Sequence, residues 1–308
     1  MVEGLFYLLL FPGLAFQVTC GLVFEWADRK LLARFQRRVG PRWYQPLADL
    51  VKLFSKEDML PTGASDWAAT ILPLVSLASV LTAGLYVPIA GFTPFSFEGD
   101  LIVILFFMGV PTMAYYLVGM SSVGIYSILG GARSLLQYFS YEVPLLLAFS
   151  GPAVLSGSWS VSGILEAQTE LGPFFLFQPV GFGLAVVGLI GKLKRDPLDI
   201  PKAKSEVVAG SLTEFSGPKL ALWHLVMDIQ AIIGIFLLIN LFFGAPVGAA
   251  PWIGALIFGG EVLLMIFILS AASSLFARLR IDQLAGLGWR VLVPAGIIQL
   301  LFVILMGV

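Results

Sequence analysis

The chain has 308 residues, of which 58% are hydrophobic and only 12% are charged. Soluble domains carry about 25% charged residues, so this composition, with its long apolar runs, predicts a polytopic membrane protein. The net charge of −1 gives no reason to expect a nucleic-acid partner. With one cysteine, Cys20, and one histidine, His224, the chain alone can hold neither a cysteine-ligated iron–sulfur or zinc site nor a haem between paired histidines. We therefore expect no metal site.

The apolar runs predict helices rather than strands. Membrane β-barrels alternate apolar and polar residues, so the expected fold is all-α, in a single transmembrane domain over residues 1–308. Each run is close to the ~20 residues that a bilayer-spanning helix needs. No Lys or Arg precedes residue 29, so we expect the first run to be a retained span rather than a signal peptide. The eight predicted spans are 4–26, 66–90, 100–120, 134–157, 173–192, 219–243, 251–276 and 287–307.

The basic residues are segregated by loop. All 18 Lys and Arg lie in one set of alternate loops, and the other set has none. Because basic loops tend to stay in the cytoplasm, the pattern predicts a multi-pass protein of the cell membrane with both termini on the outer face. The basic loops are 25–65, 121–133, 192–219 and 277–290, and the others are 91–99, 158–172 and 244–250.

The stretch 25–58 is the longest polar run and predicts a docking surface. Its eight basic residues are Arg29, Lys30, Arg34, Arg37, Arg38, Arg42, Lys52 and Lys56. Within it, Pro46 is suited to the first turn of a helix. Four apolar residues then share one face at helical spacing: Leu47, Leu50, Val51 and Phe54. We therefore expect an amphipathic helix that lies along the membrane surface.

Several acidic residues lie where a membrane span would bury them. They are Glu25, Glu142, Asp228 and Glu261, and we add Glu206 and Glu214 from the loop 192–219. In this interpretation no Lys or Arg lies deep enough in a span to pair with them. An unpaired buried carboxyl can hold a proton near neutral pH, so a chain of such groups could relay protons. Each acid could instead simply hydrogen-bond a neighbouring helix.

No glycine loop of the GxxxxGK[ST] or GxGxxG type occurs, so nucleotide binding is unsupported. The residues alone leave three classes open: a transporter, a channel, or a subunit of a larger complex. An inverted repeat with matching broken spans, which would favour a stand-alone secondary transporter, is not evident.

Three polar blocks and one span segment resemble a known family. The blocks are EWADRKLLARFQRRVGP…QPLADLVKLFSKED (25–58), DPLDIPKAKSEVVAGSLTEFSGPKLAL (196–222) and ARLRIDQLAGLGWRVLVP (277–294), and the span segment is SYEVP (140–144). They resemble the signature segments of the membrane subunit known as subunit 1 of respiratory complex I. That family is shared with membrane-bound energy-converting [NiFe] hydrogenases and related sulfur reductases.

The resemblance implies a subunit that anchors a peripheral redox arm and begins an acid-lined path for ion pumping. The proton-path candidates are Glu142, Glu206, Glu214, Asp228, Glu261 and Asp199. The arm-docking candidates are Glu25, Arg29, Arg37, Arg38, Gly40, Pro41, Asp49, Lys52, Arg278, Arg280 and Asp282. No catalytic residue is expected on this chain.

Departures from the family pattern concern the quinone site. The join GPRWYQP (40–46) lacks several residues that quinone-reducing members carry there. Lys202 and Lys204 replace two family glutamates, which inverts the local charge. Met227 occupies the position of a family glutamate, with Asp228 one residue further, about 100° around a helix. Glu261 and Ser273 stand where complex I members often carry lysine and arginine. Together these departures favour a relative that does not reduce quinone.

We therefore expect a non-catalytic anchor and coupling subunit of a complex-I-like assembly of the hydrogenase or sulfur-reductase type. Its expected partners are hydrogenase-like large and small subunits of the redox arm, antiporter-like membrane subunits and lipid. Iron–sulfur clusters, and in a hydrogenase a [NiFe] centre, would belong to those partners. The alternatives are a quinone-reducing complex I subunit with a shortened loop and a stand-alone secondary transporter.

Overall fold

The computed structural model describes residues 2–244 and 251–306, and within these ranges the fold is all-α, as predicted. A π-helical turn, Gly288–Leu292, joins the last two helices. The helices are α1 (Val2–Leu9), α2 (Leu14–Phe35), α3 (Gln45–Phe54), α4 (Asp66–Tyr86), α5 (Asp100–Met120), α6 (Ile125–Ser156), α7 (Val161–Leu171), α8 (Phe174–Phe177), α9 (Pro179–Lys192), α10 (Lys204–Val207), α11 (Gly217–Phe242), α12 (Pro251–Leu275), α13 (Ile281–Leu287) and α14 (Val293–Met306).

The predicted spans are confirmed in number and approximate position. Within the described ranges, seven helical stretches are long and apolar enough to cross a membrane, and the shorter apolar α9 corresponds to the fifth predicted span. The chain is therefore a polytopic membrane protein. Residue 307, the predicted end of the last span, and residues 245–250 of the predicted loop 244–250 lie outside the described residues.

Three predicted boundaries were wrong. Helix α2 continues to Phe35 rather than ending at residue 26, because its charged residues find partners in neighbouring elements and need not leave the helix. Helix α6 begins at Ile125, well before residue 134. The fifth span is interrupted at Gln178, before Pro179, so that α8 and α9 are separate helices.

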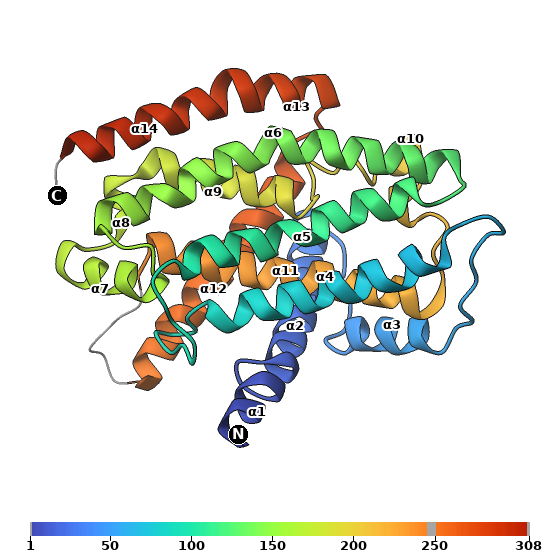
Figure 1. Cartoon of the computed structure of the whole chain (residues 1–308), viewed down its shortest axis with the longest axis horizontal. Coiled ribbons are helices and arrows are strands. Elements are labelled where there is room, and N and C mark those ends of the chain that lie inside the picture. Colours follow the sequence, from blue (N-terminus) through green and yellow to red (C-terminus); the bar gives the residue numbers. More distant parts are fainter. Residues whose placement is uncertain (1, 245–250, 307–308) are drawn as a thin grey trace.

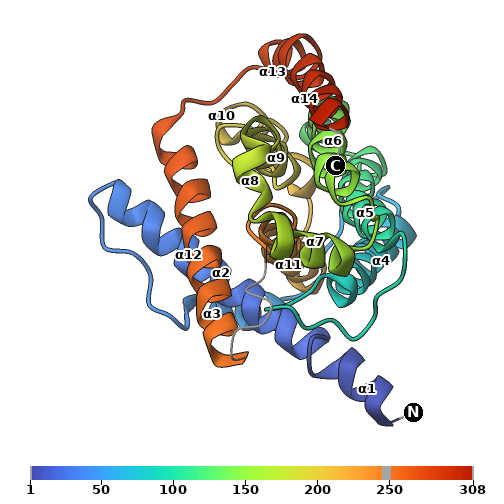
Figure 2. The same ribbon diagram turned by 90° about the vertical axis from the view of Figure 1, so that its left-hand side faces the viewer.

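The helices form one bundle with two members set across it. Figure 1 shows α4, α5, α6, α9, α11 and α14 running side by side, and Figure 2 views them nearly end-on. Helices α2 and α12 cross this direction, and both pack against α11. Elements of the predicted basic loops, α3, α10 and α13, lie at one end of the bundle, and α7 and α8 lie at the other.

Helix α11 is the centre of the bundle. In its most apolar stretch 89% of the residues are buried, against 17–61% for the other candidate spans. A helix that is apolar on all sides is stable only when surrounded, and α11 contacts α2, α4 and α12. It therefore positions the residues at its first turns, including His224 and Asp228, between α2 and the loop after α9.

Buried side-chain amides tie the helices together. Gln230 Nε2 of α11 donates to the Met108 carbonyl of α5 at 2.9 Å. Gln137 Nε2 of α6 donates to the carbonyls of Gly191 and Leu198, each at 2.7 Å. Such bonds are stable in an apolar interior because an unpaired amide would be costly there. The Gln137 bonds also fix the end of α9 and the loop that follows it.

Helix α6 continues through Pro144, two residues after Glu142, but lacks one backbone hydrogen bond there. Proline has no N–H, so the Ser140 carbonyl loses its helical partner. Gly288, the first residue of the π-helical turn, lies against that carbonyl, where a Cβ atom would clash. The π-helical turn that precedes α14 therefore packs against α6 close to Glu142.

The predicted amphipathic helix is confirmed as α3, with Pro46 in its first turn. Leu47, Val51 and Phe54 are all exposed. An exposed apolar face beside membrane spans is typical of a helix at the membrane surface.

We expect Gly188→Ala to destabilise the bundle. A Cβ at this position of α9 would lie 2.9 Å from the Cβ of Leu145 on α6, a fully buried residue. Overpacking of this kind costs about 1–3 kcal/mol, more than the roughly 1 kcal/mol that alanine gains in a helix. The measurement is the melting temperature in detergent. Gly183→Ala is the control, because a Cβ there meets nothing within 4 Å. Equal melting temperatures for the two variants would contradict the tight α6–α9 contact.

Candidate functional site

Two adjoining cavities lie at the end of the bundle that carries α3 and the loop after α9. One has a volume of about 230 Å³ and lies between α2, α3 and α11. The other, of about 260 Å³, lies between α2, α11 and the loop 193–202. Glu25, His224 and Asp228 line both. Two predicted acids from opposite ends of the sequence, Glu25 and Asp228, thus share one charged chamber.

Arg195 holds this chamber together. Its guanidinium forms ion pairs with Asp28 and, at 3.4 Å, with Glu25 on α2. It also lies over the ring of Phe24, 4.7 Å from the centroid. Asp28 in turn accepts a hydrogen bond of 2.8 Å from Ser270 Oγ on α12. One cation therefore connects α2, α12 and the loop after α9.

A second set of ion pairs joins α2 to the surface helix. Arg29 Nε lies 2.5 Å from Glu25, and its Nη1 lies 2.9 Å from Asp49 on α3. Gln45 Nε2 donates to Asp49 at 2.9 Å. Partial burial alone would raise the pKa of Asp49, but the bonds from Gln45 and Arg29 outweigh it and the pKa is lowered. The predicted docking residues Glu25, Arg29 and Asp49 thus form one cluster.

Asp199 and Lys202 bring the loop after α9 into the same chamber. Asp199 pairs with Arg278 at 3.0 Å. Burial, with help from the charge of Asp196, raises the pKa of Asp199 to about 6. Lys202 Nζ donates to the sulfur of Met227 at 2.8 Å. A lysine here thus contacts the methionine that occupies the family's glutamate position.

Glu142 is paired, contrary to the expectation that no cation lies deep enough to reach it. Lys192 Nζ, at the end of α9, donates to both carboxylate oxygens at 2.8 and 2.7 Å. Only 2% of the Lys192 side chain is exposed. The sequence interpretation assigned Lys192 to a loop because it closes the apolar run. Its four-carbon side chain reaches back into the bundle.

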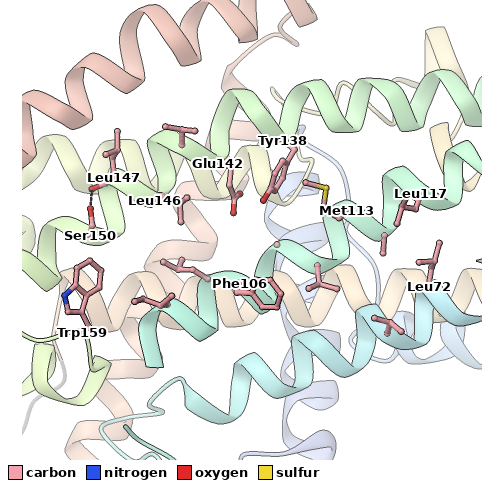
Figure 3. A pocket seen from close by; sticks show the side chains of 17 residues that line it. Leu72, Phe106, Met113, Leu117, Tyr138, Glu142, Leu146, Leu147, Ser150 and Trp159 are labelled. Carbon is pink, nitrogen blue, oxygen red and sulfur yellow. Dashed lines mark hydrogen bonds between the residues drawn. The ribbon is translucent and has the colours of Figure 1, made fainter. Parts of the chain in front are cut away.

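Glu142 also lines a wide apolar groove between α4, α5 and α6, with a volume of about 970 Å³. Figure 3 shows Glu142 and Tyr138 directed from α6 toward α5. The groove wall is otherwise almost entirely apolar, with residues such as Phe106 and Leu146. The Glu142–Lys192 pair thus lies between the interior of the bundle and a groove at its surface.

The remaining predicted path acids do not join this set. Glu206 of α10 forms an ion pair with Arg133 of α6. Glu214 accepts a bond of 3.3 Å from the Val123 amide. One carboxylate oxygen of Glu261 is buried without a hydrogen-bond partner among the described residues. The six predicted acids therefore occupy several places rather than one continuous line.

The other docking candidates lie at the surface. Arg37, Arg38 and Lys52 are exposed. Gly40 is packed closely against the Lys30 side chain, and Pro41 follows it directly. Arg278, Arg280 and Asp282 line a third cavity of about 250 Å³ together with Arg133 and Glu206.

Sequence reasoning missed Asp28, Lys192, Lys194 and Arg195. The loop-by-loop count treated the three basic residues as surface charge. A usable signal existed for Arg195, which directly precedes the second family-like block, and for Asp28, which lies within the first. Their burial depends on how α2 crosses the bundle, which no local pattern records.

Comparison with known proteins agrees with the motifs. A family model described as NADH dehydrogenase matches residues 8–304. An NADH-quinone oxidoreductase subunit of Dehalococcoides mccartyi (strain CBDB1) is 33% identical, over 97% of this chain and 85% of that protein. The corresponding NADH-quinone oxidoreductase subunit of Geobacter metallireducens is 34% identical, over 92% of this chain and 91% of that protein.

The fold also matches a solved structure. A chain of the membrane-bound sulfane sulfur reductase, an archaeal respiratory membrane complex, superposes with a TM-score of 0.85 at 24% identity. The match covers 94% of this chain and 96% of that one. At this identity the likeness concerns the fold.

Asp199 provides a pH test of the chamber. Its pKa of about 6 exceeds the value of about 4 expected in the unfolded chain. The folded state therefore loses stability as pH rises from 4 to 6, on the order of 2 kcal/mol. The Asp199→Asn variant has no carboxyl group to titrate and does not lose this stability. Its melting temperature, measured relative to that of the original protein, should therefore increase as the pH is raised from 4 to 7. Asp282→Asn, an exposed carboxylate of the same surface, is the matched control. A difference in melting temperature between Asp199→Asn and the original protein that stays constant with pH would refute the raised pKa of Asp199.

Proposed function

This chain belongs to the family of subunit 1 of respiratory complex I, and we propose that it is a non-catalytic anchor and coupling subunit. It docks a peripheral redox arm through the surface around α3 and the loop after α9. It then links electron transfer in that arm to ion translocation in the membrane. The charged chamber beneath this surface is the observation that carries the proposal.

The chamber suits a docking and sensing function because its charges are balanced yet close to the surface. Arg29 joins Glu25 at the inner end to Asp49 on α3. A partner that contacts α3 therefore acts directly on the pairs that hold Arg195. Charges a few ångströms apart in a partly buried site interact by several kcal/mol, so a charge change in the arm would redistribute protons in the chamber.

The coupling path would then run toward Glu142 and its partner Lys192. This pair lies beside the groove between α4, α5 and α6, where a neighbouring membrane subunit or lipid could reach it. In this proposal Asp199 and Asp228 belong to the chamber end of the path and Glu142 to the membrane end. Glu206, Glu214 and Glu261 stay as candidates for branches of the same path.

The hydrogenase or sulfur-reductase type is supported by the chamber as well as by the short join 40–46. Lys202 places an amine against Met227, where the resemblance implies two acidic groups. We therefore propose that this subunit does not itself bind a reducible quinone. Hydrogenase-like arm subunits with iron–sulfur clusters, and antiporter-like membrane subunits, are the proposed partners. The cell membrane, with both termini outside, is the proposed location.

Glu142→Gln should lower the number of ions moved per electron while the assembled complex still transfers electrons. The substitution removes the titratable group but leaves Lys192 buried without its counter-ion, which alone can destabilise. The double variant Glu142→Gln/Lys192→Met removes both charges and is the control for that effect. Ion uptake by proteoliposomes, measured against electron transfer, is the readout. Unchanged pumping in both variants would rule out a path through Glu142.

A quinone-reducing function is the second candidate, favoured by the similarity to proteins named as subunits of NADH-quinone oxidoreductase. Under our proposal, a photoreactive quinone analogue should not label the stretches 25–58 and 192–219 above background. The labelled peptides can be identified by mass spectrometry of the purified complex. Specific labelling that excess unlabelled quinone prevents would establish the alternative instead.

A further inference from the structure

Two buried glutamines meet near the end of the bundle that carries α8, opposite the charged chamber (Figure 1). Gln178 lies at the break between α8 and α9, and Gln299 lies on α14. They are 1% and 7% exposed, and Gln299 Nε2 donates to Gln178 Oε1 at 3.2 Å. Gln178 Nε2 and Gln299 Oε1 have no hydrogen-bond partner among the described residues. The pair therefore retains one buried donor group and one buried acceptor.

This balance does not depend on which way the amides are turned. If both side-chain amides are turned over, Gln178 donates to Gln299, and again one nitrogen and one oxygen are left over. Glycines make room for the pair. A Cβ atom at Gly151 of α6 would clash with the Gln178 amide, and one at Gly181 of α9 would clash with the Gln299 amide. The sequence thus keeps space for two amides where α6, α9 and α14 meet.

The glutamine pair lies at membrane depth. The residues that follow Gln299 in α14, 300–306, are all apolar, so Gln299 lies about 10 Å inside the end of this span. In the hydrocarbon region no water is present to pair with a free polar group. An amide donor and an amide acceptor that stay unpaired there are unfavourable. The pair is therefore suited to a partner that supplies both kinds of hydrogen bond.

A cavity of about 360 Å³ between the start of α9 and α14 adjoins the pair. Besides the two glutamines it is lined by apolar residues: Phe177, Pro179, Val180, Ala295, Ile298 and Phe302. A mostly apolar cavity of this size with a few polar groups is typical of a small-molecule site. None of these described residues is charged, and the outer loops predicted at this end contain no Lys or Arg. The cavity therefore suits a neutral ligand rather than a phosphate or a carboxylate.

We propose that this cavity binds a neutral glycerolipid with a free hydroxyl group, of the diacylglycerol type. The hydroxyl donates to the free amide oxygen. The free amide nitrogen has two N–H groups, which donate to the hydroxyl oxygen and to an ester carbonyl of the lipid. The last bond of a glutamine side chain turns with little restraint, so these atoms can meet a polar group that enters the cavity. An acyl chain then lies against Val180, Ile298 and Phe302.

The bound lipid would tie the last span to the break before α9. This site is separate from the charged chamber and from Glu142, so it does not depend on the proposed coupling function. A side-chain hydroxyl on a helix of a neighbouring subunit could meet the same two amides, and the experiment distinguishes it from a lipid.

Photolabelling of the purified complex in lipid nanodiscs tests the site without changing the protein. The probe is a diacylglycerol with a diazirine in one acyl chain, and it is compared with the analogue in which hydrogen replaces the hydroxyl group. The diacylglycerol should label the peptides that contain 177–180 and 295–302 at least about fivefold more strongly, the factor that one net hydrogen bond supplies. Equal labelling would show only contact with apolar lipid, and no labelling would show that a partner helix or another group fills the site. Either result would overturn the proposal.

Two variants test the recognition by the amides. Gln178→Leu/Gln299→Leu removes both amides at similar volume, so the two probes should label it equally. Ala295→Phe keeps both amides but fills the cavity, so labelling by either probe should fall to background. Gln36→Leu changes an exposed glutamine after α2 and is the control, which should keep the preference for the hydroxyl. A preference that survives in the double variant would refute the site. If that variant does not assemble, full labelling of Ala295→Phe would refute it instead.

Discussion

The partly buried charge of Arg195, whose side chain is 19% exposed, is the constraint around which one end of this bundle is organised. An arginine cannot lose its proton in a protein, so its burial requires anions nearby. Glu25 and Asp28 supply them from α2, and Ser270 of α12 completes the hydrogen bonds of Asp28. Removing one partner of a buried pair commonly costs about 3–5 kcal/mol. One guanidinium therefore links the loop after α9 to the place where α2 and α12 cross α11.

The same requirement explains why the charges deeper in the bundle occur where they do. Glu142 is tolerable inside a span because Lys192 reaches it with two hydrogen bonds. Just beyond Glu142, Pro144 removes one backbone hydrogen bond from α6, and the π-helical turn at Gly288 packs against the Ser140 carbonyl that this leaves free. Irregular backbone and paired charge occur together at this point, as they commonly do where function requires an otherwise unfavourable arrangement.

Lys194 differs from both cases because its amine has an aromatic ring rather than a carboxylate beside it. An ammonium over the face of an aromatic ring gains a cation–π attraction, so the ring takes the place of a counter-ion here. Three lysines of the segment 192–202 thus have three electrostatic situations: Lys192 faces a carboxylate, Lys194 a ring and Lys202 a thioether. The path that the family resemblance implies to be lined by acids would therefore be partly lined by lysines in this chain.

The sequence by itself determined the class of the protein. Runs of about 20 apolar residues are sufficient to place helices in a membrane, and the stripe from Leu47 to Phe54 was sufficient for α3. The three family-like blocks indicated the family to which the chain belongs. The sequence did not determine which charged residues pair with one another. Lys192 and Arg195 follow an apolar run, so a linear interpretation places them in solvent, yet the tertiary structure buries Lys192 and leaves only 19% of the Arg195 side chain exposed. Which carboxylate a long side chain meets depends on helices such as α2 and α12 that lie far apart in sequence and cross in space. Only the packed bundle therefore decided that Glu142 is paired and that Lys194 has no carboxylate partner among the residues that the structure describes.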